Sequence, residues 1–373
     1  MAEATTLPAA AQDTPGVRAR ALRPLVRPWL LMLLGLCVLA GFELYVRALD
    51  ASRGYSWNAR TAWYWLFEQD PALGYRGRPG ASAWIPGERV EHGPDGFRER
   101  RALAALPPRN ERRLVLCVGD ANTYGLTAGS AERSYPAVLE RELRALSGDA
   151  RWTVVNAGVP GYTSHEVLEL LKLRLLKLEP EVVVAMSLAT DFEHVALYLD
   201  DALDYNAYAL RMAPWAATRA SDLLMRSALV GRLAQRWRER HPDDLGGRHP
   251  LTAYGETTPR GRRWFLDNVD LTAALAARAG ARLMWVDQPI HYSTCSYGDT
   301  KIASVEALRV ELRGVCRERG VPVLEAHAGF DWEGLTLAGD LLLGSNETRL
   351  GALGYERLAR RLAPQILSSL SPR

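Results

Sequence analysis

From residue 113 to the C-terminus, short apolar runs alternate with longer amphipathic stretches, and this alternation restricts the folds open to the chain. The apolar runs have the length of buried strands, and the stretches between them place apolar residues at helical spacing. Strands that alternate with helices form parallel β-α-β units, so the pattern predicts an α/β fold with a parallel sheet covered on both faces. The predicted strands are residues 113–118, 152–156, 181–187, 281–287 and 321–325.

Helix start signals occur between these strands. A helix is predicted near Ser134, because Pro136 is tolerated in a first turn. Thr163 and Glu166 have the spacing of a capping box ahead of a leucine-rich stretch. Further helices are predicted over residues 262–279, 304–319 and 352–370, whereas residues 192–260 form a long, mostly helical insertion.

Ligands of parallel α/β sheets bind beyond the carboxyl ends of the strands. Three predicted loops fall at that edge, at residues 120–125, 156–161 and 187–193. We therefore expect the functional site at this rim, capped by the insertion.

The N-terminal region carries a membrane signal. Four arginines, at positions 18, 20, 23 and 27, precede the apolar segment 28–46. About 20 apolar residues span a bilayer, and arginines on one side favour a cytoplasmic location for that side. The sequence predicts a cytoplasmic, disordered stretch 1–27, an uncleaved anchor 28–46 and a periplasmic or extracellular remainder. A cleaved signal peptide is disfavoured, because no small-x-small site follows and Leu36 precedes Cys37.

Residues 47–110 are rich in aromatic residues, glycine and proline, which predicts irregular structure with short strands before a domain over residues 111–373. The net charge of +3 gives no case for nucleic acid. No cysteine and histidine spacing suggests zinc, and no metal or cofactor is expected. A disulfide between Cys295 and Cys316 stays open, because sequence alone cannot set their distance.

Four sequence blocks occur in order: "VGDANTYG", "VVNAGVPGYTS", "VVVAMSLATDF" and "SNETRLGALGYERLARRLAP". Together they resemble the SGNH (GDSL-type) hydrolase superfamily of esterases, lipases and carbohydrate acyl-ester hydrolases. The resemblance covers residues 113–370 and implies a flavodoxin-like three-layer α/β/α fold. The preceding "DPALGYRGRPG" and "GPDGFRERR" are similar to membrane-anchored bacterial members, which implies a setting in envelope or exopolysaccharide handling.

Enzymes of this superfamily attack an ester with a serine, which a histidine deprotonates and an aspartate assists. Backbone N–H groups and an asparagine stabilise the oxyanion. When the functional positions of the superfamily are placed on the four blocks of this sequence, the serine position is Ala121, the glycine position is Gly158 and the asparagine position is Thr190. The aspartate and histidine positions are Asn346 and Arg349.

Four of these five positions are substituted, which predicts a catalytically inactive pseudoenzyme. Ala121 has no nucleophile, and Arg349 cannot act as a base because its pKa lies above ~12. In another serine hydrolase, loss of the nucleophile alone lowers turnover by a factor on the order of 10⁶. The chain would then bind or scaffold a carbohydrate or acyl-carbohydrate.

A binding pocket is predicted at the same rim. The N–H groups of Ala121 and Gly158 and the guanidinium of Arg349 favour an anionic or polyhydroxylated ligand. Pairing of Arg349 with Glu347 or Asp191 is the alternative. The predicted pocket comprises Asp120, Ala121, Asn156, Gly158, Thr190, Asp191 and Arg349.

Two other functions are left open. An active acyl-ester hydrolase or O-acyltransferase would need a relocated site. The candidate groups for it are His165, His194, His291, Ser293, Asp120, Asp191, Glu193 and Asp287. A structural interaction protein would instead contact a protein partner through residues 192–260 or 55–90.

Overall fold

The computed structural model describes residues 28–52, 66–85, 88–192, 257–290, 299–330 and 350–370, together with positions 227, 229, 230 and 233. The predicted insertion 192–260 therefore lies almost entirely outside the described residues, as does the stretch 1–27. The chain divides into two units, Met1–Tyr45 and Val46–Arg373. Each is considered by itself.

Helix α1 (Pro28–Ser52) contains the predicted anchor. Its portion Pro28–Leu49 has 22 residues and a mean hydropathy of 2.1, so it is long and apolar enough to cross a membrane. At 1.5 Å per residue, a helix of this length extends about 33 Å, which matches a hydrocarbon core of about 30 Å.

Five parallel strands form the main sheet of the second unit, in the order β6-β5-β7-β8-β9. All four neighbouring pairs are parallel, as predicted. This order is that of flavodoxin-like doubly wound sheets. The strands are β5 (Arg113–Gly119), β6 (Trp152–Gly158), β7 (Val182–Met186), β8 (Arg282–Val286) and β9 (Val323–Leu324).

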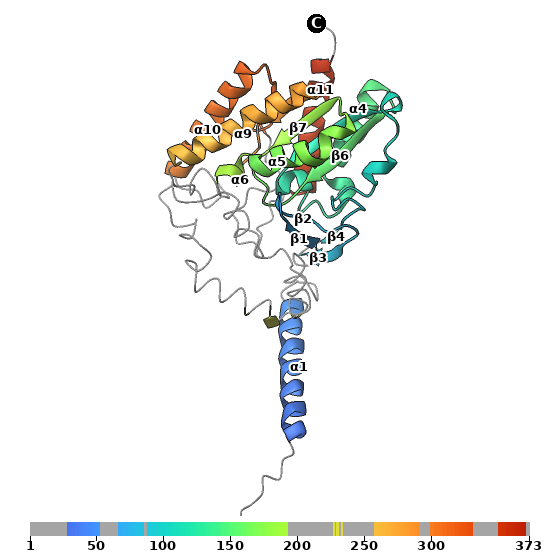
Figure 1. The fold of residues 1–373 in the computed structure, drawn as a ribbon, viewed down its shortest axis with the longest axis vertical. Helices are drawn as coiled ribbons and strands as arrows, with labels where there is room; N and C mark the ends of the chain where they lie inside the picture. The colour runs from blue at the N-terminus through green and yellow to red at the C-terminus, as the bar shows by residue number, and fades with distance from the viewer. Residues whose placement is uncertain are drawn as a thin grey trace, which may run out of the picture. The chain divides into compact units, whose positions relative to one another are not determined.

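Helices cover both faces of this sheet, which makes three layers (Figure 1). Apolar side chains alternate along the strands, so each strand contributes to two hydrophobic clusters on opposite faces. One face packs against α5 (Ser164–Leu170), α9 (Pro259–Arg278) and α10 (Asp299–Glu318), and the other against α4 (Tyr135–Ser147) and α11 (Ala352–Leu370).

The predicted capping box at the start of α5 is present. Glu166 accepts the backbone N–H of Thr163 at 2.8 Å, and the Thr163 hydroxyl accepts the N–H of His165 at 3.3 Å. The α-helix ends at Leu170 and continues as a π turn, Leu171–Leu175, and a 3₁₀ turn, Leu176–Leu178. The leucine-rich stretch is thus helical throughout, but its hydrogen-bond pattern changes from α to π and then to 3₁₀.

Two short antiparallel hairpins precede the main sheet. They pair β1 (Phe67–Asp70) with β2 (Gly74–Gly77), and β3 (Ser82–Ile85) with β4 (Glu88–Glu91). Buried residues of these hairpins belong to the same hydrophobic cluster as α5, α9 and α10. The described part of the predicted region 47–110 therefore shares its core with the α/β layers.

Candidate functional site

The loop after β5 forms a tight turn around the position predicted for the nucleophile. Helix α3 (Ala121–Tyr124) begins directly after Asp120, whose carboxylate caps it by accepting the N–H of Asn122 at 2.9 Å. The helix ends at Gly125 in a left-handed conformation, with φ 80°. Ala121 is 9% exposed and belongs to the buried core.

Two glycines bring the neighbouring strands close to this turn. Gly119 has φ +149°, and a Cβ built on it would lie 2.0 Å from the carbonyl oxygen of Met186 in β7. A Cβ on Gly158 would lie 2.3 Å from the backbone nitrogen of Tyr124. Both positions therefore need glycine for close backbone packing, whether or not the site is catalytic.

Asp120 is the centre of a buried hydrogen-bond network. Its second carboxylate oxygen accepts the Thr190 hydroxyl at 3.0 Å and the Gln288 amide at 3.1 Å. The three predicted residues Asp120, Ala121 and Thr190 are thus brought together, Thr190 from α6 (Ala189–Asp191).

Gln288 is a site residue that the sequence analysis missed. It is fully buried after β8, and its side-chain oxygen accepts the N–H groups of Leu188 and Ala189 at 2.9 and 3.0 Å. It therefore joins the ends of β7 and β8 to the Asp120 turn. The sequence could have indicated Gln288 by its position directly after the predicted strand 281–287, at the carboxyl edge of the sheet.

Gly158 does not direct its N–H toward an open pocket. That N–H donates to the side-chain oxygen of Asn156 at 3.1 Å, and the Asn156 amide donates to the Tyr124 carbonyl at 3.2 Å. Asn156 thus ties β6 to the end of α3. The expectation of a free N–H at this position needs correction, because a neighbouring side chain satisfies it.

Asp191 lies at the same rim but faces a different partner. Its carboxylate accepts both the N–H and the hydroxyl of Ser164, at 2.9 and 2.6 Å, and Ser164 is itself contacted by the Asn268 amide at 3.3 Å. Asp191 and Ser164 are fully buried. Burial raises the pKa of Asp191 to about 7, against the opposing effect of the hydrogen bonds from Ser164 and Ser187.

This raised pKa predicts a pH-dependent stability. Asp191 holds its proton more tightly in the folded than in the unfolded state, so its contribution to stability is complete below pH 4 and is lost as the pH rises through 7. A shift of three pKa units corresponds to about 4 kcal/mol. The side chain at position 191 of the variant Asp191→Asn does not titrate, so only the wild type loses this contribution as the pH rises. The free energy of unfolding of the variant should therefore increase relative to that of the wild type by up to about 4 kcal/mol between pH 4 and pH 7. Urea titrations of both proteins at each pH measure this difference, and a flat difference would contradict it.

Two serine hydroxyls near the turn are engaged within the chain. Ser164 donates to Asp191 and Ser134 donates to the Ala131 carbonyl at 2.6 Å. Both serines are buried to 1% exposure or less. A serine nucleophile needs a base and access to substrate, and neither of these two serines has access.

Other predicted groups divide between the rim and the undescribed segments. Asp287 is buried between Arg309 and Arg313, which makes it part of an ion-pair cluster. His165 lies at the start of α5, with its ring centroid 5.6 Å from that of Trp264. In the ranges described, no three His, Cys, Asp or Glu side chains gather as metal ligands. Of the residues singled out in the sequence, the following lie outside the described ranges: Glu193, His194, His291, Ser293, Cys295, Asn346, Glu347 and Arg349. Cys316, in contrast, is a free buried thiol in α10.

No family model matches this chain, and no curated protein matches it. Solved structures are similar to it at low identity. A lipase/acylhydrolase from Enterococcus faecalis is 16% identical, with a TM-score of 0.43, over 70% of this chain and 98% of that one. A GDSL-like lipase from Bacteroides thetaiotaomicron is 11% identical, with a TM-score of 0.40, over 71% of this chain and 93% of that one. The acetylxylan esterase Axe2 from Geobacillus stearothermophilus is 13% identical, with a TM-score of 0.42, over 68% and 94%.

These similarities carry no argument about activity. The strand order, the parallel pairing and the two helical layers are observed in the chain itself. This protein has the flavodoxin-like three-layer fold that its resemblance to SGNH hydrolases predicts.

Proposed function

We propose that this protein is a membrane-anchored, extracytoplasmic pseudoenzyme that binds a carbohydrate or acyl-carbohydrate ligand without hydrolysing it. The observation that carries the proposal is Ala121 itself. It occupies the first position of α3, in a turn with an intact cap and close-packed glycines. On this proposal the turn keeps the form that presents a nucleophile, and Ala121 supplies none.

The surrounding polar groups support binding over catalysis. Asp120 already accepts hydrogen bonds from Asn122, Thr190 and Gln288, so it is committed to holding the turn. Asp191 is committed in the same way to Ser164. A group that holds several internal hydrogen bonds must break them before it can move a proton for a substrate.

Arg349 is the group to which we assign ligand recognition. Its sequence neighbour Leu350 donates its N–H to the side-chain oxygen of Asn122 at 3.2 Å, and Asn122 directly follows Ala121. Arg349 directly precedes Leu350 in the sequence. A guanidinium there would favour a carboxylate or sulfate group on a glycan.

The anchor supports the location in the proposal. Helix α1 is long and apolar enough to cross a bilayer, and arginines at positions 18, 20, 23 and 27 precede it. Arginine on one side of a span favours a cytoplasmic location for that side. The α/β unit would then lie outside the cytoplasm.

An esterase assay on the full chain in detergent tests the absence of hydrolysis. We expect no turnover of an activated acetyl ester or of acetylated sugars above that of boiled protein. Ala121→Ser should stay inactive too, because the hydroxyl it restores would still lack a base when position 349 is arginine. Turnover that is abolished by Ser293→Ala or His291→Ala would instead establish a relocated active site.

A glycan-binding screen tests the other half of the proposal. We expect an acidic oligosaccharide to bind, and Arg349→Ala to weaken its affinity by about tenfold to a hundredfold, the loss of one charge-assisted hydrogen bond. Arg317→Ala is the matched control, because Arg317 is exposed near the end of α10 that leads into β9. Equal effects of the two variants would contradict a specific site at position 349.

A further inference from the structure

A buried ion pair joins β4 to the loop that follows it. Arg98 and Glu88 are each 1% exposed in their side chains, and the guanidinium nitrogen lies 2.7 Å from the carboxylate oxygen. Burying two charges costs several kcal/mol per ion unless further hydrogen bonds satisfy them. The positions of those further bonds therefore indicate what the pair holds.

Both members of the pair also bind the loop that follows α3. Arg98 donates to the carbonyl oxygen of Gly125, and Glu88 accepts the N–H of Thr127 at 2.8 Å. Thr127 has φ 72°, a left-handed conformation that a β-branched residue rarely adopts. Such strain persists only where the surroundings determine the backbone, and Glu88 supplies one of those contacts.

Thr127 in turn reaches the C-terminal block. Its hydroxyl donates to the Leu350 carbonyl at 2.8 Å. Because the Leu350 N–H also binds Asn122, this residue is held on both sides of its backbone by the α3 region. A continuous set of contacts thus joins Glu88 to the residue that follows Arg349.

Other residues of the same segment hold α3 and the loop after β6. The His92 ring nitrogen Nε2 lies 2.7 Å from the hydroxyl of Tyr124, the last residue of α3. The Tyr75 hydroxyl donates to the Pro160 carbonyl, and the Tyr162 hydroxyl donates to the Tyr75 carbonyl, both at 2.6 Å. Two of the three predicted site loops, 120–125 and 156–161, are therefore contacted from residues 66–85 and 88–101.

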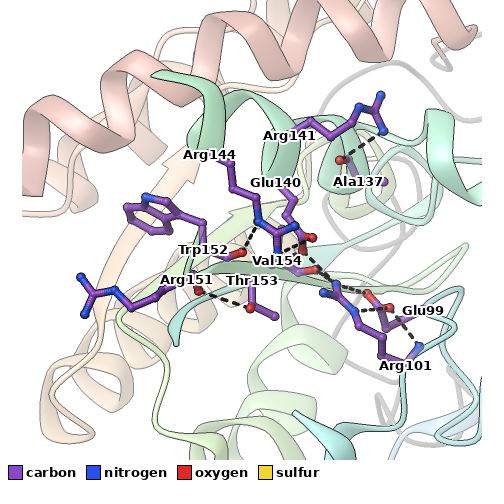
Figure 2. A network of polar contacts seen from close by, with 10 residues as sticks. All are labelled: Glu99, Arg101, Ala137, Glu140, Arg141, Arg144, Arg151, Trp152, Thr153 and Val154. Carbon is purple, nitrogen blue, oxygen red and sulfur yellow. Dashed lines mark hydrogen bonds and ion pairs between the residues drawn. The ribbon is translucent and has the colours of Figure 1, made fainter. Parts of the chain in front are cut away.

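The segment is fastened to the edge of the sheet as well (Figure 2). Arg101 donates to the Val154 carbonyl at 2.7 Å and to Glu140 at 2.9 Å, and Glu140 accepts the Val154 N–H at 2.8 Å. These contacts occupy backbone groups of β6, one of the two edge strands of the sheet. They fix the end of the segment on the α/β layers.

We infer that residues 66–85 and 88–101 form a clamp that sets the geometry of the functional rim, with Arg98 and Glu88 as its positioning residues. Since this segment precedes the α/β layers in the chain, the site depends on residues outside those layers as well as on the layers themselves. The inference concerns the site of the proposed function, but its test below requires no ligand and no activity.

The test uses a thiol at the rim of the full chain in detergent. Ala121→Cys installs that thiol, and mass spectrometry follows its alkylation by iodoacetamide, peptide by peptide. Into this background we introduce Arg98→Met with Glu88→Met, which removes both charges and keeps similar volume, so global stability can be retained. The control is Arg113→Met with Glu181→Met, because that pair, at 2.5 Å, joins the start of β5 to the residue before β7 at the opposite edge of the sheet.

We expect the Arg98 and Glu88 double variant to speed alkylation at position 121 at least tenfold and the control to change it less than twofold. Hydrogen exchange at the Thr127 amide should also rise in the first variant alone. Equal alkylation rates in the two double variants, with both proteins folded, would overturn the inference. Turnover or ligand binding does not enter this readout, so failure of the proposed function would leave the result interpretable.

A second variant keeps the inference testable if the double variant does not fold. Tyr75→Phe removes only the hydroxyl that binds Pro160. We expect faster amide exchange across residues 159–163 and unchanged exchange in α4. Unchanged exchange in both places would count against the clamp.

Discussion

Gly158→Ala is expected to lower the free energy of unfolding by at least about 3 kcal/mol, the upper part of the range for overpacked cores. The added Cβ would lie 2.3 Å from the Tyr124 nitrogen and 2.6 Å from the Thr123 carbonyl carbon. Both are backbone atoms of α3, so no side-chain rotation can relieve the overlap. Relief would require β6 and α3 to move apart, which would also break the hydrogen bond from the Asn156 amide to the Tyr124 carbonyl.

Gly314→Ala is the matched control for this prediction. Gly314 lies inside α10, and a Cβ built there has no atom within 4 Å. Alanine should therefore stabilise the protein by about 0.5–1 kcal/mol, the difference in helix preference. Guanidinium denaturation of the full chain measures both variants. A small effect of Gly158→Ala, comparable in size to that of Gly314→Ala, would show that the turn adapts and that this glycine is not needed for packing.

Asp287→Ala is expected to destabilise the protein by about 3–5 kcal/mol, the cost of removing one partner of a buried ion pair, because the contact that Arg309 keeps with Glu306, at 3.3 Å, is to a partly exposed carboxylate. Asp287 is fully buried and contacts both Arg309 and Arg313, and Arg309 is 1% exposed. Burial, with the neighbouring Arg313, lowers the pKa of Arg309 to about 9. Removing the carboxylate leaves that guanidinium in a site where its charge is already costly.

Two comparisons separate this effect from a general loss of stability. Asp270→Ala removes the partner of Arg319 on the surface, and such exposed pairs contribute about 0–1 kcal/mol. Asp287→Leu with Arg309→Met removes both buried charges and should cost less than Asp287→Ala alone. A double variant as unstable as the single one would show that the charge of Arg309 is not the cause. Denaturation midpoints of all three proteins provide the measurement.

Asp287 also influences the candidate site through its sequence neighbour. Arg309 donates to the Gln288 carbonyl at 3.1 Å, while the Gln288 side chain binds Asp120 and the N–H groups of α6. The ion-pair cluster therefore supports the residue that joins three strand ends. We interpret Asp287 as part of the scaffold of the rim, in contrast to its role as a candidate group of a relocated active site.

The sequence predicted those features that depend on local pattern. The five strands follow from short apolar runs, and the parallel pairing follows from their alternation with helices. The capping box at Thr163 follows from two residues three positions apart. The turn at residues 120–125 follows from glycine and aspartate after an apolar run, whereas the short helix α3 inside it was not predicted.

Strand ends were predicted less well than strand positions. β6 extends to Gly158, two residues beyond the prediction, because it pairs with β5 as far as Gly119. β9 is only Val323–Leu324, shorter than the predicted 321–325, since it pairs with β8 over two residues at the edge of the sheet. In both cases the neighbouring strand decides where the ladder ends.

The sequence by itself thus determined the fold class, the candidate membrane helix and the position of the turn that lacks a serine. All of these follow from residues close together in the chain, where apolar period, charge and turn residues act locally. Tertiary structure alone decided which polar groups meet. Gln288 binds Asp120 across 168 residues of sequence, Arg98 reaches Gly125 across 27, and the Asn156 amide reaches the Tyr124 carbonyl across 32. Buried polar groups need hydrogen-bond partners, and the packing of the elements decides which groups lie close enough to pair. The same sequence pattern is compatible with many such pairings.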